Sequence, residues 1–286
     1  MHFYDFLKQE LLLISQLIDI SIFILLMFYH KCPIPSRFFL HSSPLYSIII
    51  SDFHIVIYQQ YRFSLFSYNY LLGKILSCEY LPGQEISKKM LNEQLSFGRT
   101  PIREALVTLK SKNLITVYPR KGMQIRPFTK KYINEIYQIR KLMEPHIMLQ
   151  FKDAYAKAML LDLQSELESC KDADDAFFYK KDIQFHMYFI EMTRNDALIA
   201  FYENIMIETY RLAMFAAINR YSTREYNIPQ HAKIIQALMT ENNDQIAAAV
   251  NEHINYSLVT LFRVLDHLEE LKNGSQETES RTQDSA

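Results

Sequence analysis

The sequence of 286 residues contains only five glycines, and none of them belongs to a glycine-rich loop. Neither a GxGxxG pattern nor a P-loop is present, which argues against the common nucleotide-binding sites. Three cysteines occur, Cys32, Cys78 and Cys170; they form no CxxC pair and cannot all pair with one another. This cysteine usage is typical of a protein of the reducing cytoplasm.

Acidic and basic residues nearly balance over the whole chain, whose formal net charge is −1, but they are unevenly distributed. Residues 74–126 carry ten lysines and arginines against four acidic residues, a local net charge of +6. Such an excess is the electrostatic footprint of a domain that binds phosphate groups. The chain is long enough to bury two separate cores, so this region can be a domain of its own.

One stretch contains both a start signal for a helix and two arginines. It is Phe97-Gly-Arg-Thr-Pro-Ile-Arg-Glu-Ala-Leu106. Proline is tolerated in the first turn of a helix, so Pro101 places the start here, with Gly98 or Thr100 as N-cap. Apolar residues at 102, 105, 106 and 109 share one face. Three other side chains project from the exposed N-terminal end: Arg99, Thr100 and Arg103. A recognition helix presents its first residues to the base edges in this way, and an arginine fork bonds guanine O6 and N7 together.

The neighbouring segments complete the pattern of a winged helix-turn-helix. Residues 70–80 and 86–95 show helical periodicity and are separated by the turn Leu81-Pro82-Gly83. Residues 114–118 and 123–126 are strand-like and flank Pro119-Arg-Lys-Gly122, which predicts a hairpin with a basic tip. We expect this DNA-binding domain over residues 64–128; the alternative is a solvated basic face on an ordinary helical domain.

Several stretches resemble the winged-helix domain of GntR-family transcription regulators. They are Tyr80-Leu-Pro-Gly-Gln-Glu-Ile86, Leu91-Asn-Glu-Gln-Leu95, Arg99 to Leu106, Leu114-Ile115 and Arg120-Lys-Gly-Met123. The resemblance implies a homodimer that binds a pseudo-palindromic operator and inserts its wing tip into the minor groove. It assigns Arg99, Thr100, Arg103 and Gly122 to DNA. We expect Lys88, Arg120 and Lys121 to add backbone contacts.

Three positions depart from the family pattern. Gly98 stands in place of a common serine, Cys78 in place of a common glycine, and Asn92 in place of a common alanine. The serine would supply a side-chain cap, but a glycine at the N-cap lowers helix stability by only about 0.3 kcal/mol relative to serine. We therefore expect the domain to fold.

The chain after Phe128 shows helical periodicity throughout. We expect helices near residues 132–152, 154–170, 174–193, 197–220, 229–240 and 244–271, joined by short loops. Such helices form an antiparallel bundle, here of six or seven helices over residues 129–271. The fold class is thus mainly α, a winged helix-turn-helix followed by this bundle. Residues 272–286 are polar without periodicity, which predicts a disordered tail.

One acidic residue and three histidines of the bundle form a possible ligand set. Asp182 and His186 are four residues apart, hence on one face of one helix, while His231 and His253 belong to two later helices. One carboxylate and three imidazoles suit Zn, Ni, Mn or Fe and leave coordination positions open. The spacing alone leaves an equal alternative, independent histidines that are satisfied in the core or solvated.

The same residues resemble the FCD effector-binding domain of the FadR subfamily of GntR regulators. The resemblance includes Asn195, Ile234, Ile235, Ala237 and Asn243-Asp244. It implies that Asp182, His186, His231 and His253 bind a divalent cation below a cavity for a small organic acid. It also implies effector contacts for Arg140 and Asn195, although Arg140 can equally pair with Glu144 at i+4.

The first 63 residues are the least explained part. Leu11 to Tyr29 is an apolar window interrupted by Gln16 and Asp19, long enough to span a bilayer. Residues 33–61 have no clear periodicity. Three interpretations remain: a misplaced start codon, a membrane anchor, or an appendage that is soluble or prone to aggregate. No cleavage-site pattern supports a signal peptide.

The sequence therefore predicts a cytoplasmic, metal-containing transcription regulator that is not an enzyme. A small carboxylate in the helical domain would control its binding to operator DNA. The alternatives are a metal-dependent hydrolase and a membrane-tethered form of the same regulator. Against the hydrolase, no glutamate that could act as general base flanks the ligands in sequence, and no nucleophile elbow exists.

Overall fold

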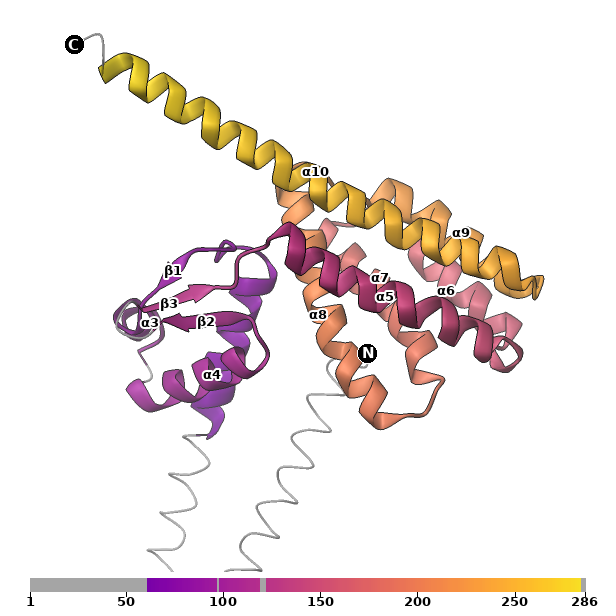
Figure 1. The fold of residues 1–286 in the computed structure, drawn as a ribbon. Helices are drawn as coiled ribbons and strands as arrows, with labels where there is room; N and C mark the ends of the chain where they lie inside the picture. Colours follow the sequence, from indigo (N-terminus) through magenta and orange to yellow (C-terminus); the bar gives the residue numbers. More distant parts are fainter. Residues whose placement is uncertain (1–60, 97, 119–121, 284–286) are drawn as a thin grey trace, which may run out of the picture. The chain divides into compact units, whose positions relative to one another are not determined.

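The computed structural model describes residues 61–96, 98–118 and 122–283, by backbone alone from 272 onward (Figure 1). Residues 1–60, and with them the apolar window at Leu11 to Tyr29, lie outside this description. Within the described residues, no helix combines the length and apolar character needed to cross a bilayer. The description covers a winged-helix part, residues 61–125, and a helical bundle that begins at Lys130.

The winged-helix part contains three helices and a small sheet. Residues 61–76 are helical, and β1 (Glu85–Ile86), α3 (Lys88–Leu95), α4 (Arg99–Ser111), β2 (Ile115–Tyr118) and β3 (Gly122–Ile125) follow. The sheet is antiparallel with the order β1-β3-β2 (Figure 1). Cross-strand pairs such as Ile115 with Ile125 set the register of the hairpin. The hairpin that the sequence predicts is therefore present, although residues 119–121 at its tip lie outside the described residues.

Local signals explain where these helices begin. Ser87 caps α3 by accepting a hydrogen bond from the Met90 amide at 3.1 Å. Gly98 is the N-cap of α4 and makes no side-chain cap. The predicted inner face of α4 is buried: Ile102, Ala105, Leu106 and Leu109. The sequence placed Ile86 at the start of α3; it lies instead in β1, because its backbone pairs with Met123 of β3.

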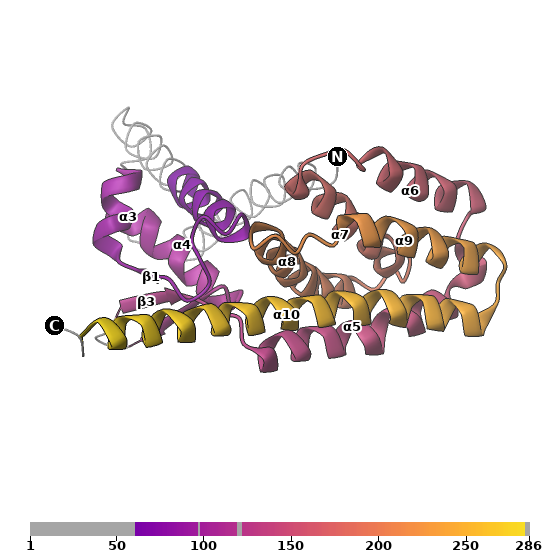
Figure 2. The ribbon, with the colours of Figure 1, turned by 90° about the horizontal axis from the view of Figure 1, so that it is seen from above.

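Six helices form the bundle. They are α5 (Lys130–Gln150), α6 (Lys157–Ser169), α7 (Asp175–Glu191), α8 (Asp196–Ile218), α9 (Arg224–Met239) and α10 (Asn243–Gln283), with a 3-10 turn, η1 (Lys152–Ala154), after α5. α10 packs along α5 and α9, and α7 packs along α8 (Figure 2). Side-chain caps fix four starts, at Thr129, Asp174, Asn195 and Asn242. This is the six-helix arrangement that the periodicity predicts.

Three helices differ most from the prediction. The first helix of the winged-helix part covers residues 61–76 rather than 70–80, and it ends before Cys78, whose φ of 57° is not helical. α9 begins at Arg224, five residues before the predicted Pro229, which lies inside the helix. Proline removes one backbone hydrogen bond there, and packing of the apolar face offsets that cost. α10 continues through residues 272–283, where a disordered tail was expected. Glutamine, glutamate, lysine and arginine of this run are good helix formers, so an existing helix can continue through them.

Candidate metal centre and DNA-reading helix

The four predicted metal ligands converge in the core of the bundle. α7 supplies Asp182 and His186, α9 supplies His231, and α10 supplies His253. One ligand atom from each lies within 4.8 Å of all the others. The histidine side chains are at most 1% exposed, and Asp182 is 5% exposed. The i, i+4 spacing on α7 thus brings two ligands together, while helix packing adds the other two.

The ring nitrogens face one another. His186 Nε2 lies 3.4 Å from His231 Nε2 and 3.2 Å from His253 Nε2. His231 Nε2 is 3.4 Å from the Asp182 carboxylate. Two donors about 2.1 Å from one ion are about 3.0–3.4 Å apart in octahedral or tetrahedral geometry. The donor set and its spacing therefore fit a divalent cation.

Burial sets the protonation of this cluster. Desolvation lowers the pKa of His231 well below its ordinary value, and the neighbouring His186 and Arg140 shift it in the same direction. Desolvation, with the other two histidines and Arg140, does the same for His253. These two rings are therefore neutral at pH 7, the form that coordinates metals. Desolvation raises the pKa of Asp182, although His186 and Arg140 oppose the shift.

Polar neighbours lie against three of the four ligands. Asn227 donates to Asp182 at 3.2 Å, and Gln230 Oε1 lies 3.2 Å from His253 Nδ1. Glu144 Oε2 lies 2.9 Å from His186 Nδ1. His231 Nδ1 is buried without a hydrogen-bond partner among the described residues. No local sequence pattern indicates Asn227 or Gln230, because their contacts depend on how α9 packs against α7 and α10.

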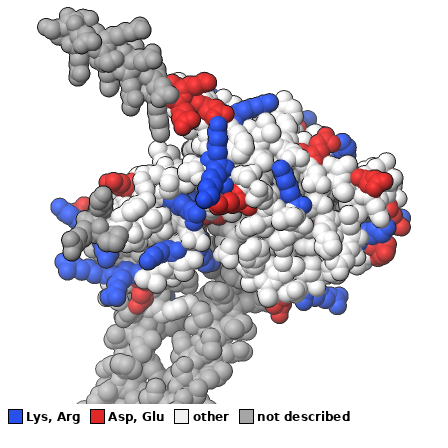
Figure 3. Space-filling model, viewed as in Figure 1, with Lys and Arg blue, Asp and Glu red and all other residues white. Residues whose placement is uncertain are grey.

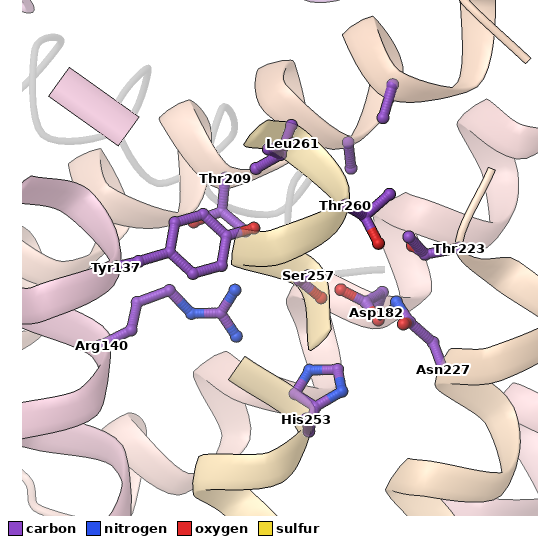
Figure 4. A pocket seen from close by; sticks show the side chains of 12 residues that line it. Tyr137, Arg140, Asp182, Thr209, Thr223, Asn227, His253, Ser257, Thr260 and Leu261 are labelled. Carbon is purple, nitrogen blue, oxygen red and sulfur yellow. Dashed lines mark hydrogen bonds between the residues drawn. The ribbon is translucent and has the colours of Figure 1, made fainter. Parts of the chain in front are cut away.

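A small cavity of about 20 Å³ lies beside the ligands. Arg140, Asp182, Ser257 and His253 point toward one another across it, with Tyr137 above Arg140 (Figure 4). Its wall also includes hydroxyl side chains of α8, the α8–α9 loop and α10: Thr209, Thr223 and Thr260. The volume corresponds to about one water molecule. The cavity is thus polar and tight.

Of the two predicted effector residues, the structure places only Arg140 at this cavity. Its Nε donates to Glu144 at 2.7 Å, and its Nη2 lies 3.2 Å from His186 Nε2. The predicted i+4 ion pair with Glu144 is therefore formed, and the guanidinium also lines the cavity. Asn195 instead caps α8 by accepting from the Leu198 amide at 3.1 Å. It lines a separate surface groove with Leu142 and His146, apart from Arg140.

The predicted DNA-reading residues that the structure describes lie in the winged-helix part. Arg99, Thr100 and Arg103 are exposed in the first two turns of α4, and Lys88 is exposed at the start of α3. On the face shown in Figure 3, lysine and arginine side chains gather over this part. Gly122 begins β3 with φ 102°, a conformation that favours glycine. Arg120 and Lys121 lie outside the described residues.

Comparison with known proteins identifies both parts. Residues 66–125 match the gntR family of bacterial regulatory proteins, and residues 135–256 match the FCD domain. The chain is a GntR-family transcriptional regulator with an FCD domain. Together the two matches confirm the family that the sequence motifs indicated, including the FadR-type combination of domains.

Individual relatives agree with this assignment. The HTH-type transcriptional regulator YdhC of Bacillus subtilis is 26% identical over 207 residues, 70% of this chain and 91% of the relative. The gluconate operon transcriptional repressor of Bacillus licheniformis is 27% identical over 192 residues, 64% and 78% of the two chains. A crystal structure of a GntR regulator from Rhodococcus sp. RHA1 covers 70% of this chain and 97% of its own, with a TM-score of 0.60 at 16% identity. The relatives are regulators, so the metal-dependent hydrolase considered above is wrong.

Proposed function

We propose that this regulator binds a pseudo-palindromic operator as a homodimer in the cytoplasm and responds to a small carboxylate at a divalent-metal site. Arg99, Thr100 and Arg103 would read bases in the major groove. Lys88, Arg120, Lys121 and the wing at Gly122 would contact the backbone and the minor groove. The exposed N-terminal end of α4 supports this assignment, since a recognition helix docks by that end.

The observation that carries the metal proposal is the convergence of three Nε2 atoms and one carboxylate in a buried site. Asp182, His186, His231 and His253 would hold Zn, Ni, Mn or Fe. When bound, the cation would supply a Lewis-acidic position for an anionic oxygen. A cation between these Nε2 atoms would accept a lone pair from each ring.

Charge supports a carboxylate as the effector. Asp182 and Glu144 contribute two negative charges and Arg140 one positive charge, so the site carries −1 when its histidines are neutral. A divalent cation changes this to +1, which attracts a monoanion. The hydroxyl groups around the cavity suit an oxygen-rich molecule. Because one relative is a repressor named for a gluconate operon, sugar acids belong among the compounds to test.

The small volume of the cavity determines how the protein would respond to its effector. A cavity of about 20 Å³ takes one water, so an organic acid has to displace its wall. That wall includes residues of α5, α8 and α10. Effector binding would therefore move helices of the bundle, and linkage requires that operator DNA change effector affinity by the same factor.

Metal content per chain tests the proposal. Wild-type protein purified without chelator should contain a divalent metal, and His253→Ala should contain much less. Small carboxylates should raise the melting temperature of the wild type only while the metal is present. Equal and near-zero metal in both proteins would show that the four residues are ordinary polar groups of the bundle.

A further inference from the structure

Glu144 is a buried carboxylate that contacts three functional groups at once. It belongs to α5 and is 1% exposed. Its Oε1 accepts hydrogen bonds from Arg140 Nε at 2.7 Å and from the Tyr202 hydroxyl at 2.6 Å. Its Oε2 lies 2.9 Å from His186 Nδ1. One oxygen is thus held by two donors, and the other faces a proposed metal ligand.

The position of Oε2 favours one tautomer of His186. A carboxylate beside Nδ1 accepts a hydrogen bond from a proton that stays on that nitrogen, which leaves the lone pair on Nε2. In the structure the Nδ1–H bond does not point directly at Oε2, which has no well-aligned hydrogen bond. A turn of the imidazole ring would align the two atoms. His186 Nε2 is the atom that faces the other two histidines.

We propose that Glu144 is a positioning residue for the metal site: it holds His186 in the Nδ1–H tautomer, with Arg140 and Tyr202 fixing its other oxygen. This inference rests on the metal site proposed above. Outer partners of metal-bound histidines typically change metal affinity by about 10–100-fold. Glu144 thereby links the metal ligand His186 to Arg140, the cationic side chain of the cavity.

Glu144→Gln tests this role with little change of shape. Arg140 and Tyr202 both donate to the position of Oε1, so the glutamine oxygen should remain there and its amide NH₂ should face His186. The NH₂ group would donate to Nδ1 and thereby move the ring proton to Nε2, where the metal would bind. Glu208→Gln is the matched control, because Glu208 is also buried but does not line the cavity.

The measurement is zinc affinity by competition with a chromophoric chelator, together with the histidine tautomer by ¹H–¹⁵N correlation spectra of the metal-free full-length chain. We expect zinc affinity to fall about 10–100-fold in Glu144→Gln and to stay unchanged in Glu208→Gln. His186 should change from the Nδ1–H to the Nε2–H tautomer only in the former. Tyr202→Phe, which removes one donor to Glu144, should weaken zinc binding by a smaller factor.

The outcomes separate this inference from the proposed function. If wild-type protein binds no zinc, the proposed metal site fails and this inference fails with it. If the wild type binds zinc and Glu144→Gln binds it equally well, only the role of Glu144 is overturned. Should Glu144→Gln fail to fold, Tyr202→Phe decides: unchanged zinc affinity in that variant overturns the inference.

Discussion

Gly98 shows how one residue can change the entry into the recognition helix. Serine is common at this position in the family. From the sequence, we therefore expected only that α4 loses a side-chain cap when glycine replaces that serine. The structure adds a backbone reason for glycine: Gly98 has φ 87° and ψ 175°, a conformation open essentially to glycine alone. The first turn of α4 therefore starts from a conformation that a serine would strain.

Replacing Gly98 by alanine should destabilise the winged-helix part by about 1–3 kcal/mol, because the new Cβ makes the positive φ unfavourable. Space is not the cause, since no atom lies within 4 Å of the added Cβ. Gly73→Ala is the control: Gly73 is helical and exposed, with equally open space, so alanine should stabilise by about 0.5–1 kcal/mol. Urea unfolding measures both. Equal effects of the two substitutions would contradict the backbone argument.

Cys78 is the second residue that departs from the family pattern, and it has φ 57°, where glycine is common. Its thiol is buried and donates to the Arg211 carbonyl at 3.8 Å. Burial raises its pKa to about 11, although Arg211 opposes the shift. At pH 8.5 roughly three thiols in a thousand would then be ionised.

Alkylation should therefore be slow at Cys78. We expect iodoacetamide to label its peptide in urea but not in the native protein at pH 8.5, and native labelling to rise with pH because only the thiolate reacts. Mass spectrometry of the digested protein gives the extent of labelling. Native labelling as fast as in urea would show that the thiol is exposed or ionised.

At the scale of elements, the sequence predicts those that carry their own local signals. α4 begins at its glycine cap and buries the expected face, and the hairpin pairs as its two strand-like runs indicated. The errors occur where distant contacts or packing decide. Ile86 joins a sheet because β3 lies beside it, and Pro229 lies inside α9 rather than at its start. Neither the pairing of Ile86 with β3 nor the packing that tolerates Pro229 inside α9 is visible in a short window of sequence.

The recognition helix gives a prediction of its own. Arg103→Ala should weaken operator binding by about 1–3 kcal/mol and relax the sequence preference at the base pair that it reads, since a bidentate arginine contact discriminates between bases. Lys88→Ala, the comparison, should weaken binding to all sequences alike and lower the salt dependence. Competition binding with operator and random DNA measures both. Unchanged selectivity in Arg103→Ala would remove α4 from base reading.

At the scale of the whole molecule, the candidate site was only partly predictable. The pair Asp182 and His186 follows from helical spacing. The residues alone left open whether His231 and His253 join that pair, and only the family resemblance favoured one set of four. Glu144 was predicted as an ion-pair partner of Arg140, not as a neighbour of His186. Asn195, predicted at the effector site, caps α8 and does not line the cavity beside Arg140. Contacts between side chains of different helices can be identified only from the packed structure.

Metal removal should affect the bundle as a unit. The proposed ligands come from α7, α9 and α10, so a bound cation would cross-link three helices. A ligand at a hundredfold excess over its Kd stabilises the native state by about 2.7 kcal/mol, so chelation should lower the melting temperature. Amide hydrogen exchange should increase in these three helices and stay constant in α4, which supplies no ligand. His253→Ala should show no change on chelation. A wild-type melting temperature that is independent of chelator and of added zinc would rule out a structural role for a cation in this bundle.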